Sequence, residues 1–334
     1  RHSQDLEEGG DAYRPGGFHP VYICDVYSAK YEILSKLGYG RYATVWLVRD
    51  LEAQESDPNE FHVLKVLSAE CYGSEKDILE REILRHLREG DQRLLGCSHI
   101  CRLVDGFEHT GPNGKHVCLV FELYGETFRS FGTWFLESMI PGQVMRRITI
   151  QLLLALDYAH YVNVIHTGKS LTLFPHTLST RCSNLFHYPP DIQPNNIFVK
   201  VRTHKFIRSG YLSIPPIQQD KAEKRYTVVP SRLMYRYYFE DGDRFDLFGF
   251  FSHPLLEKGD QDLVGRVFDD QGNVKGRTPF VDRPNLTHEE FTPGLTQEER
   301  DEFVAFLRSS MTIDPAKRPS PEDLLRGPWL RAPS

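Results

Sequence analysis

The chain has 334 residues, with 40 Lys+Arg against 46 Asp+Glu for a formal net charge of −6, 40% hydrophobic residues and six cysteines. A chain of this length can bury a sizeable core, and its acidic balance excludes a polyanion-binding surface over the whole molecule. No apolar run approaches the roughly 18 residues of a membrane-spanning helix, and six scattered cysteines do not form the framework of a disulfide-rich secreted protein.

The first residues lack the apolar stretch of a signal peptide. We therefore expect an intracellular protein, in the cytoplasm or the nucleus, that binds neither nucleic acid nor a membrane directly. Because the sequence begins with Arg1 and not with Met, we also expect it to be a fragment or the product of an incomplete gene prediction.

A Gly/Pro-punctuated arm, residues 1–30, precedes the first predicted strand. Residues 31–37 alternate apolar and polar side chains, as a half-buried strand does, and lead into the turn Gly38–Gly40. A Gly-x-Gly turn between two strands lets the backbone fold closely over phosphate oxygens and offer its N–H groups. A plain hairpin turn is the alternative. A dinucleotide-binding turn is excluded, because the β-rich run 43–48 follows the glycines where a helix would be needed.

A lysine and a glutamate in the next two elements strengthen the phosphate-binding hypothesis. Lys65 lies inside the apolar strand 62–67, where a lysine needs an anionic partner. Residues 75–87 fit an amphipathic helix, with Glu82 among its apolar positions. A strand lysine and an inward glutamate on the next helix form the pair that orients nucleotide phosphates in protein kinases. The alternative is an ordinary surface lysine and glutamate.

Two later regions complete the predicted architecture. Residues 117–123 form another apolar strand that leads to Gly125, as the hinge strand of a kinase does. Long helices are predicted over 143–160 and 297–311, the second opened by a capping box of Thr296 and Glu299.

Together these motifs resemble the serine/arginine-rich (SR) protein kinases, and among them the fungal-type members. The resemblance rests on segments spread over most of the chain: Tyr13–Val21, Lys36–Gly40, Phe121–Gly125, Gln151–His160, Val164–Thr167, Asp191–Ile197, Asp314–Ser320 and Pro328–Leu330. It implies an α+β, bilobal protein-kinase-like fold, with a β-rich small lobe over 31–124 and a helical large lobe over 125–330. It also implies a monomeric ATP- and Mg²⁺-dependent serine/threonine kinase that phosphorylates proteins, among them Arg/Ser-rich splicing factors.

The resemblance assigns roles to particular residues. Asp191 would accept the proton of the substrate hydroxyl, Asn196 would bind Mg²⁺, and Lys65 with Glu82 would anchor the phosphates. The residues implied for nucleotide binding are Leu37, Gly38, Tyr39, Gly40, Ala43, Val45, Lys65, Glu122 and Tyr124. Gln193 stands where such kinases usually carry a lysine that helps the transferring phosphoryl group, which predicts slower transfer.

The predicted catalytic loop is interrupted by residues 168–190. The family reads His-Thr-Asp without a break, whereas here Thr167 and Asp191 are separated by a segment that contains no Asp or Glu and is rich in Leu, Ser, Phe, Thr and Pro. Codons for Gly168 to Ser170 can contain the splice-donor sequence GTAAGT, and those for Pro190 and Asp191 an acceptor AG in the matching phase. We therefore interpret residues 168–190 as a translated intron. A genuine surface insertion is the alternative.

A second departure removes part of the large lobe. The sequence contains no Asp-Phe-Gly-type metal motif, activation segment or Ala-Pro-Glu-type anchor that fits the expected order. The residues Asp246 to Gly249 resemble the first of these, but the residues after them match a later part of the fold. We expect a deletion near 243–247 that removes the activation segment and the central helix. This deletion would leave Arg318 without its partner and residues 202–243 poorly ordered.

Three functions therefore stay open for the polypeptide. The first is a protein kinase with impaired or absent activity. The second is a non-catalytic, nucleotide-binding pseudokinase or scaffold, and the third is a non-functional product of a faulty gene prediction.

Overall fold

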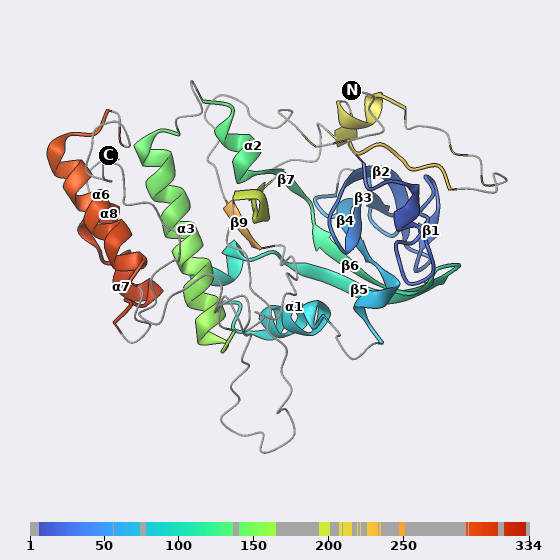
Figure 1. Cartoon of the computed structure of the whole chain (residues 1–334), viewed down its shortest axis with the longest axis horizontal. Coiled ribbons are helices and arrows are strands. Elements are labelled where there is room, and N and C mark those ends of the chain that lie inside the picture. Colours follow the sequence, from blue (N-terminus) through green and yellow to red (C-terminus); the bar gives the residue numbers. More distant parts are fainter. Residues whose placement is uncertain are drawn as a thin grey trace, which may run out of the picture.

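The computed structural model describes residues 7–55, 57–73, 78–135, 140–164, 194–200, 207–208, 210–215, 219, 221, 226–232, 234, 247–250, 292, 294–312 and 317–331. Two sheets and a group of helices make up this part of the chain (Figure 1). The interrupting segment 168–190, the residues 243–246 at the expected deletion and the predicted base Asp191 lie outside the described residues.

The first half of the chain forms a six-stranded antiparallel sheet in the order β1-β2-β3-β4-β6-β5. Its strands are β1 (Val26–Tyr27), β2 (Tyr31–Tyr39), β3 (Ala43–Asp50), β4 (Phe61–Leu67), β5 (Leu103–Gly111) and β6 (Gly114–Glu122). All seven residues of β4 are buried, because this central strand is covered on both faces. The strands predicted from the sequence over 31–37, 43–48, 62–67 and 117–123 are confirmed.

Each face of the sheet carries its own apolar cluster. One cluster, which includes Leu47, Val63 and Leu119, lies on the face that packs against helix α1 (Glu80–Glu89). The other, which includes Trp46 and Leu64, lies on the opposite face and is covered by Val21 of the N-terminal arm. The arm is therefore part of the packed core of this half of the molecule.

A smaller sheet of β7 (Tyr124–Thr127), β8 (Ile197–Lys200) and β9 (Leu247–Phe250) connects the first sheet to the helices. Helix α2 (Phe128–Gly132) follows β7, and the long helix α3 (Gly142–Tyr161) packs against both α2 and β8 through a cluster that includes Phe131 and Ile148. In Figure 1 the small sheet lies between α3 and the six-stranded sheet.

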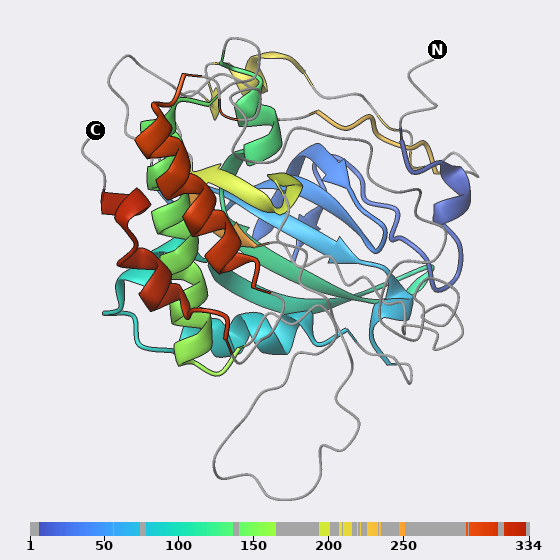
Figure 2. The same ribbon diagram turned by 60° about the vertical axis from the view of Figure 1, so that its left-hand side comes forward.

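Three C-terminal helices pack on the far side of α3. They are α6 (Gln297–Ser310), α7 (Pro321–Leu325) and α8 (Pro328–Arg331), and Figure 2 shows them lying along α3. Their contact is an apolar cluster centred on Leu153 of α3 and Trp329 and Leu330 of α8. No helix among the described residues is both long enough and apolar enough to span a lipid bilayer.

The two long helices predicted over 143–160 and 297–311 are confirmed. Helix α3 covers the predicted range 143–160 with one further residue at each end. Helix α6 begins after Thr296, whose side chain accepts a hydrogen bond from the backbone N–H of Glu299 while the Glu299 carboxylate accepts one from the Thr296 backbone, so the capping box forms as expected.

The structure bears on two expectations about the large lobe, and one of them, the loss of a buried partner for Arg318, is wrong. Arg318 is exposed and donates a hydrogen bond to the Thr312 carbonyl over 2.8 Å, so it is not a buried charge that has lost its partner. Within the region 202–243, the described residues Ile207 and Tyr211 have no exposed surface and Met234 is 4% exposed. These three residues belong to an apolar cluster of the six-stranded sheet, a contact between distant parts of the chain that local composition does not reveal. Most of this region lies outside the described residues, so its expected poor order stays a prediction.

Candidate functional site

The glycine turn lies between β2 and β3, as the sequence predicts. Gly38 pairs with Val45 and Tyr39 with Thr44, and the turn is closed by a hydrogen bond of 2.8 Å from the Gly40 N–H to the Ala43 carbonyl. A methyl group added at Gly38 would meet no atom within 4 Å, so the space beside this backbone is open. The glycines suggest that a ligand can approach this backbone closely, and the structure has room for it there.

The strand register brings Lys65 onto the face below this turn. Lys65 lies directly between Val45 of β3 and Leu119 of β6, and directly opposed residues of antiparallel strands share one face. This is the face that packs against α1. Leu37 and Val45 pack against the same apolar cluster but stay only partly buried.

A buried ion pair joins this lysine to helix α1. The Lys65 ammonium donates to Oε1 of Glu80 over 2.6 Å, and the two residues are 6% and 4% exposed. The other carboxylate oxygen, Oε2 of Glu80, is buried and accepts no hydrogen bond from the described residues. The carboxylate of Glu80 fixes the position of this ammonium.

The partner of Lys65 is therefore Glu80, and the predicted pairing with Glu82 is wrong. The helix predicted from the sequence begins at residue 75, whereas α1 begins at Glu80 and buries Glu80, Leu84 and Leu87. Two residues further along a helix turn the side chain by about 200°. Glu82 consequently points away from the sheet, where Arg81 and the Tyr72 hydroxyl donate to its carboxylate over 3.0 and 3.1 Å.

Glu122 and Tyr124 lie where the chain crosses from one sheet to the other. Glu122 ends β6, Tyr124 begins β7, and Leu123 alone separates the two strands. The Tyr124 hydroxyl accepts a hydrogen bond from the Arg102 N–H over 2.8 Å, which fixes its ring in the protein interior. The hinge position expected from the sequence is thus a physical crossing point between two sheets.

Asn196 lies at the end of a short 3-10 helix, η6 (Pro194–Asn196), immediately before β8, and it is 2% exposed. The predicted base Asp191 lies outside the described residues, which resume at Pro194, so its position relative to Asn196 stays a prediction. Asp246 also lies outside them, while the residues that follow it form β9 and pair with β8.

Sequence reasoning missed one neighbour of this face. Residues 207–213, which include the 3-10 helix η7 (Tyr211–Ser213), pack into the same apolar cluster as Leu37 and Val45. The Tyr211 hydroxyl and Oγ of Ser35 in β2 form a hydrogen bond of 3.1 Å. The apolar side chains of Ile207 and Tyr211 are the local signal for this packing. The residues that they contact lie far away in the sequence, so local patterns do not reveal the contact.

The chemistry of the face fits a nucleoside triphosphate better than a self-contained metal site. Lys65, the open glycine turn and the half-buried side chains of Leu37 and Val45 offer charge, backbone donors and an apolar surface. Among the described residues no three His, Cys, Asp or Glu side chains are arranged to hold a metal ion. Of the predicted Mg²⁺ ligands, Asn196 is the one that the structure describes.

Comparison with known proteins gives several relatives. The chain is 41% identical over 163 residues to the protein kinase dsk1 of Schizosaccharomyces pombe, an alignment that covers 48% of this chain and 29% of that protein. It is 34% identical over 169 residues to the human SRSF protein kinase 3, with 49% of this chain and 28% of that protein covered. The chain thus matches less than a third of the length of each of these two proteins.

A third relative matches nearly the whole chain. A serine/threonine protein kinase of Aspergillus fumigatus is 26% identical over 381 residues, covering 98% of this chain and 91% of that protein. The alignment is longer than this chain, so it contains positions at which this chain has no residue. No protein-family model matches the chain. The α+β architecture, with its β-sheet lobe and its helices, fits the kinase fold of these relatives, and about half of the chain is similar in sequence to eukaryotic protein kinases of the SR-protein-kinase type.

Proposed function

We propose that this chain is an ATP-dependent protein serine/threonine kinase of the SR type whose activity is impaired or absent. The observation that carries the proposal is the buried pair of Lys65 and Glu80 on the face below the Gly38–Gly40 turn. A buried lysine that pairs with a carboxylate and borders an open glycine turn is suited to phosphate binding.

Each residue of the face would contribute a distinct interaction. Lys65, oriented by Glu80, would contact phosphate oxygens, and the N–H groups of the turn would donate to them from above. Leu37, Ala43 and Val45 would cover the base, and the backbone of Glu122 and Tyr124 would hydrogen-bond its edge. Bound Mg²⁺ and ATP would supply the transferable phosphoryl group and the neutralisation of its charge.

The transfer itself would depend on the loop that precedes β8. Asp191 would accept the proton of the attacking serine or threonine hydroxyl, and Asn196 would hold Mg²⁺. Gln193 can donate a hydrogen bond but brings no charge to the phosphoryl group, so transfer would be slower than with a lysine.

We propose that the enzyme is a monomer, that it acts inside the cell and that its substrates are Arg/Ser-rich proteins. The name of the human relative, SRSF protein kinase 3, supports this substrate class. The acidic net charge of −6 is compatible with an arginine-rich partner.

Two departures from the family underlie the proposed loss of activity. Residues 168–190 separate Thr167 from Asp191, although catalytic groups must be held within a fraction of an ångström. The proposed deletion near 243–247 would remove the second Mg²⁺ ligand and the activation segment. The gaps that this chain needs in its alignment with the Aspergillus kinase support a deletion, without giving its place.

Sequencing of the gene and its transcripts tests both departures. We expect a GT within the genomic codon of Gly168, an AG across the boundary between the codons of Pro190 and Asp191, and a spliced transcript that joins Thr167 directly to Asp191. Codons without these dinucleotides would make residues 168–190 a genuine insertion. A transcript that carries additional sequence between Arg244 and Leu247 would show that the deletion is an error of the gene prediction.

Assays on the purified full chain test the activity. The kinase proposal predicts Mg²⁺-dependent stabilisation against heat by ATP, and slow transfer of phosphate to an Arg-Ser peptide that is lost in Asp191→Ala. Stabilisation by ATP without any transfer would favour a pseudokinase or scaffold. The absence of both stabilisation and a cooperative melting transition would favour a non-functional product.

A further inference from the structure

A second lysine of the six-stranded sheet is buried more completely than Lys65. Lys36 lies in β2, two residues before Gly38, and its side chain has no exposed surface. It pairs with Trp46, which faces the apolar cluster covered by the N-terminal arm, so it points to the opposite face from Lys65. A buried ammonium must have all its donors satisfied, because desolvation otherwise costs several kcal/mol.

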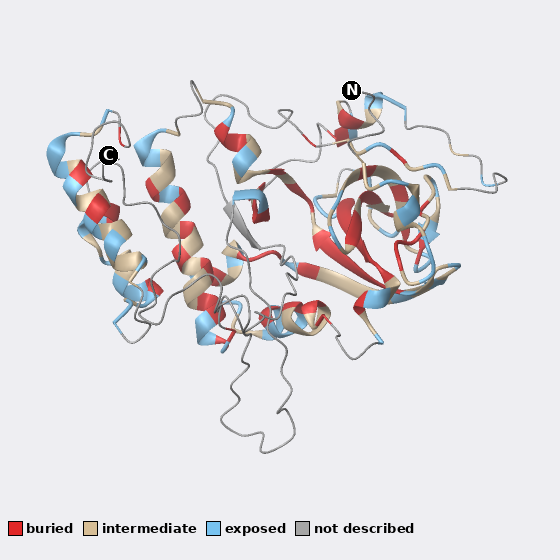
Figure 3. Ribbon diagram, viewed as in Figure 1, coloured by how far each residue is buried: buried red, intermediate tan, exposed pale blue. Residues whose placement is uncertain are grey.

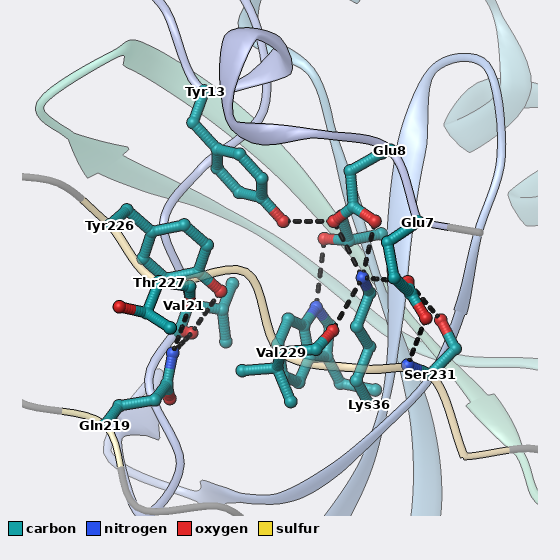
Figure 4. Close-up of polar contacts among 12 residues, drawn as sticks. Glu7, Glu8, Tyr13, Val21, Lys36, Gln219, Tyr226, Thr227, Val229 and Ser231 are labelled. Carbon is teal, nitrogen blue, oxygen red and sulfur yellow. Dashed lines mark hydrogen bonds and ion pairs between the residues drawn. The ribbon is translucent and has the colours of Figure 1, made fainter. Parts of the chain in front are cut away.

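Two consecutive acidic residues of the arm satisfy this lysine. The Lys36 ammonium lies 2.7 and 2.6 Å from the two carboxylate oxygens of Glu8 and 2.9 Å from Oε2 of Glu7, and it donates to the Val229 carbonyl over 3.0 Å (Figure 4). Both carboxylates are largely buried, at 13% and 3% exposure of the Glu7 and Glu8 side chains. This is a tight ionic contact between residues 28 and 29 positions apart in the chain.

The second negative charge of the pair is balanced by neutral donors. The Ser231 N–H and hydroxyl donate to the two oxygens of Glu7 over 2.6 and 2.8 Å, and the Tyr13 hydroxyl donates to Glu8. Burial by itself raises the pKa of Glu7, but the hydrogen bonds from Ser231 and Lys36 outweigh it, so that the pKa lies below its ordinary value. The charges and hydrogen-bond donors of this group are therefore matched within the protein.

A third part of the chain, residues 226–232, closes the contact. Besides Val229 and Ser231, the Arg232 N–H donates to the Lys36 carbonyl over 2.9 Å, and the Tyr226 hydroxyl donates to the carbonyl of Val21 in the arm over 2.8 Å. Thus the arm, strand β2 and residues 226–232 are joined at one point. We call the group of Glu7, Glu8, Lys36 and Ser231 the Lys36 clamp.

The clamp lies immediately before an irregularity in the strand. Pairing of β2 with β3 shifts between Lys36 and Gly38, so Leu37 is an extra residue in the ladder. A bulge of this kind bends the strand and redirects the residues beyond it. Because Lys36 is the last regularly paired residue before the bulge, its anchoring sets the direction in which the glycine turn leaves the sheet.

We propose that Lys36 is a positioning residue: the Lys36 clamp fixes the Gly38–Gly40 turn above the Lys65 face, and the acidic arm is thereby required for tight nucleotide binding. The inference rests on the proposed function, since it assigns to the turn the covering of a nucleotide. It goes beyond that function by giving the N-terminal arm and residues 226–232 a role in the same site from the opposite face of the sheet.

The test compares the doubly substituted variant Glu7→Gln/Glu8→Gln with the wild-type chain. The amides keep the shape of the carboxylates but remove both charges, leaving the Lys36 ammonium without an anion. We expect the dissociation constant for Mg²⁺·ATP, measured by calorimetry well below the melting temperature, to rise about tenfold as the turn loses its pre-organisation. Backbone amides of residues 38–42 should exchange hydrogen faster, while those of β4 keep their protection.

Two further variants separate positioning from stability. Glu52→Gln removes one carboxylate from the pair of Lys30 and Glu52, whose charged atoms are 2.7 Å apart beside the ends of β2 and β3, and should leave both measurements unchanged. Ser231→Ala removes one donor to Glu7 and keeps all charges, so it provides a folded variant even if the double substitution unfolds the chain. We expect its effects to have the same direction and smaller size.

Each outcome decides between the two proposals. A lower melting temperature with unchanged nucleotide affinity and unchanged exchange at residues 38–42 would overturn the clamp inference and leave a structural ion pair. If the wild-type chain binds no Mg²⁺·ATP at all, the proposed function fails, and hydrogen exchange alone then decides whether the clamp holds the turn.

Discussion

The ammonium of Lys65 in β4 lies 2.6 Å from Oε1 of Glu80 at the first turn of α1, and neither residue is more than 6% exposed. The contact joins the sheet to the helix on the face that the Gly38–Gly40 turn overhangs. At the other end of α1, the Leu87 carbonyl accepts a hydrogen bond of 2.6 Å from the Tyr158 hydroxyl of α3. Helix α1 therefore connects the candidate phosphate-binding lysine to the helical part of the molecule.

Glu80→Gln is expected to weaken both the fold and nucleotide binding. The substitution leaves a buried ammonium without its carboxylate, which costs about 3 kcal/mol of unfolding free energy, and it frees the lysine from its orientation. Urea unfolding gives the first effect and titration with Mg²⁺·ATP the second.

Glu82→Gln is the matched control, two residues away on the same helix. Its side chain is 41% exposed and contacts Arg81 and Tyr72, so unfolding free energy should change by no more than about 0.5 kcal/mol and nucleotide affinity not at all. If Glu82→Gln impaired nucleotide binding and Glu80→Gln did not, the assignment of the pair would be reversed.

The difference between these two glutamates marks what the sequence could and could not predict. The strands and the capping box of Thr296 and Glu299 follow from patterns a few residues long, and both are confirmed. The partner of Lys65 depends on where α1 begins. Ile78 and Leu79 continue the apolar spacing of the helix toward the N-terminus, but α1 starts only at Glu80, and no side-chain cap marks this start in the sequence.

Contacts between distant segments were beyond the reach of local patterns altogether. The alternating pattern of residues 31–37 does not indicate a buried ion pair at Lys36, because its acidic partners Glu7 and Glu8 lie in an arm with no periodicity. In the same way Tyr211 gave no sign that it would pack on β2. Figure 3 shows buried residues both on the strands of the sheet and on segments that cover it.

Stability should fall as the pH is lowered from about 6.5, because of three histidines where the arm meets β5 and β6. Burial lowers the pKa of His19 to about 3, with smaller contributions from His109 and His116, and burial also lowers the pKa of those two rings. The ring centroid of His19 lies 4.6 Å from that of His109 and 4.9 Å from that of His116. The folded chain thus keeps these imidazoles neutral, while the unfolded chain takes up protons near pH 6.5.

The unfolded state therefore binds more protons between about pH 6.5 and pH 3, and the stabilisation present above this window is lost as the pH falls through it. His19 alone contributes a slope of up to about 1.4 kcal/mol per pH unit. Melting temperatures measured from pH 7.5 to pH 5 should show this slope, and His19→Gln should flatten it. An equal slope in the variant would mean that other groups cause the loss.

Ile207→Ala should destabilise the half of the molecule that contains the six-stranded sheet. The Ile207 side chain has no exposed surface and belongs to the same apolar cluster as Leu47 and Val63. Removing three buried carbons costs about 2–5 kcal/mol when the cavity does not collapse. Unfolding followed by intrinsic tryptophan fluorescence, to which Trp46 buried in this sheet contributes together with Trp134 and Trp329, measures the change. Ile214→Ala, at a 56% exposed position of the same segment, should leave stability unchanged. Equal, small effects of both substitutions would mean that residues 207–214 do not pack on the sheet in solution.

Gly38→Ala separates the function of the glycine turn from its role in folding. The added methyl group would meet nothing within 4 Å, so the fold tolerates it, and unfolding free energy should stay within about 1 kcal/mol of the wild-type value. The methyl group would instead occupy the open space beside the backbone, where phosphate oxygens need close access to the N–H groups. We expect weaker binding of Mg²⁺·ATP with an unchanged melting temperature.

Gly96→Ala provides the opposite case in the same chain. A methyl group there would lie 2.0 Å from the Leu154 carbonyl oxygen of α3. Helix α3 and the short 3-10 helix Leu95–His99 that contains Gly96 would therefore have to move apart, at a cost of about 1–3 kcal/mol or more. Gly96→Ala should therefore lower the melting temperature markedly, whereas Gly38→Ala should lower only nucleotide affinity. If Gly38→Ala bound Mg²⁺·ATP as tightly as the wild-type chain, the turn would be an ordinary hairpin, and the proposed contacts between its N–H groups and the phosphates would be wrong.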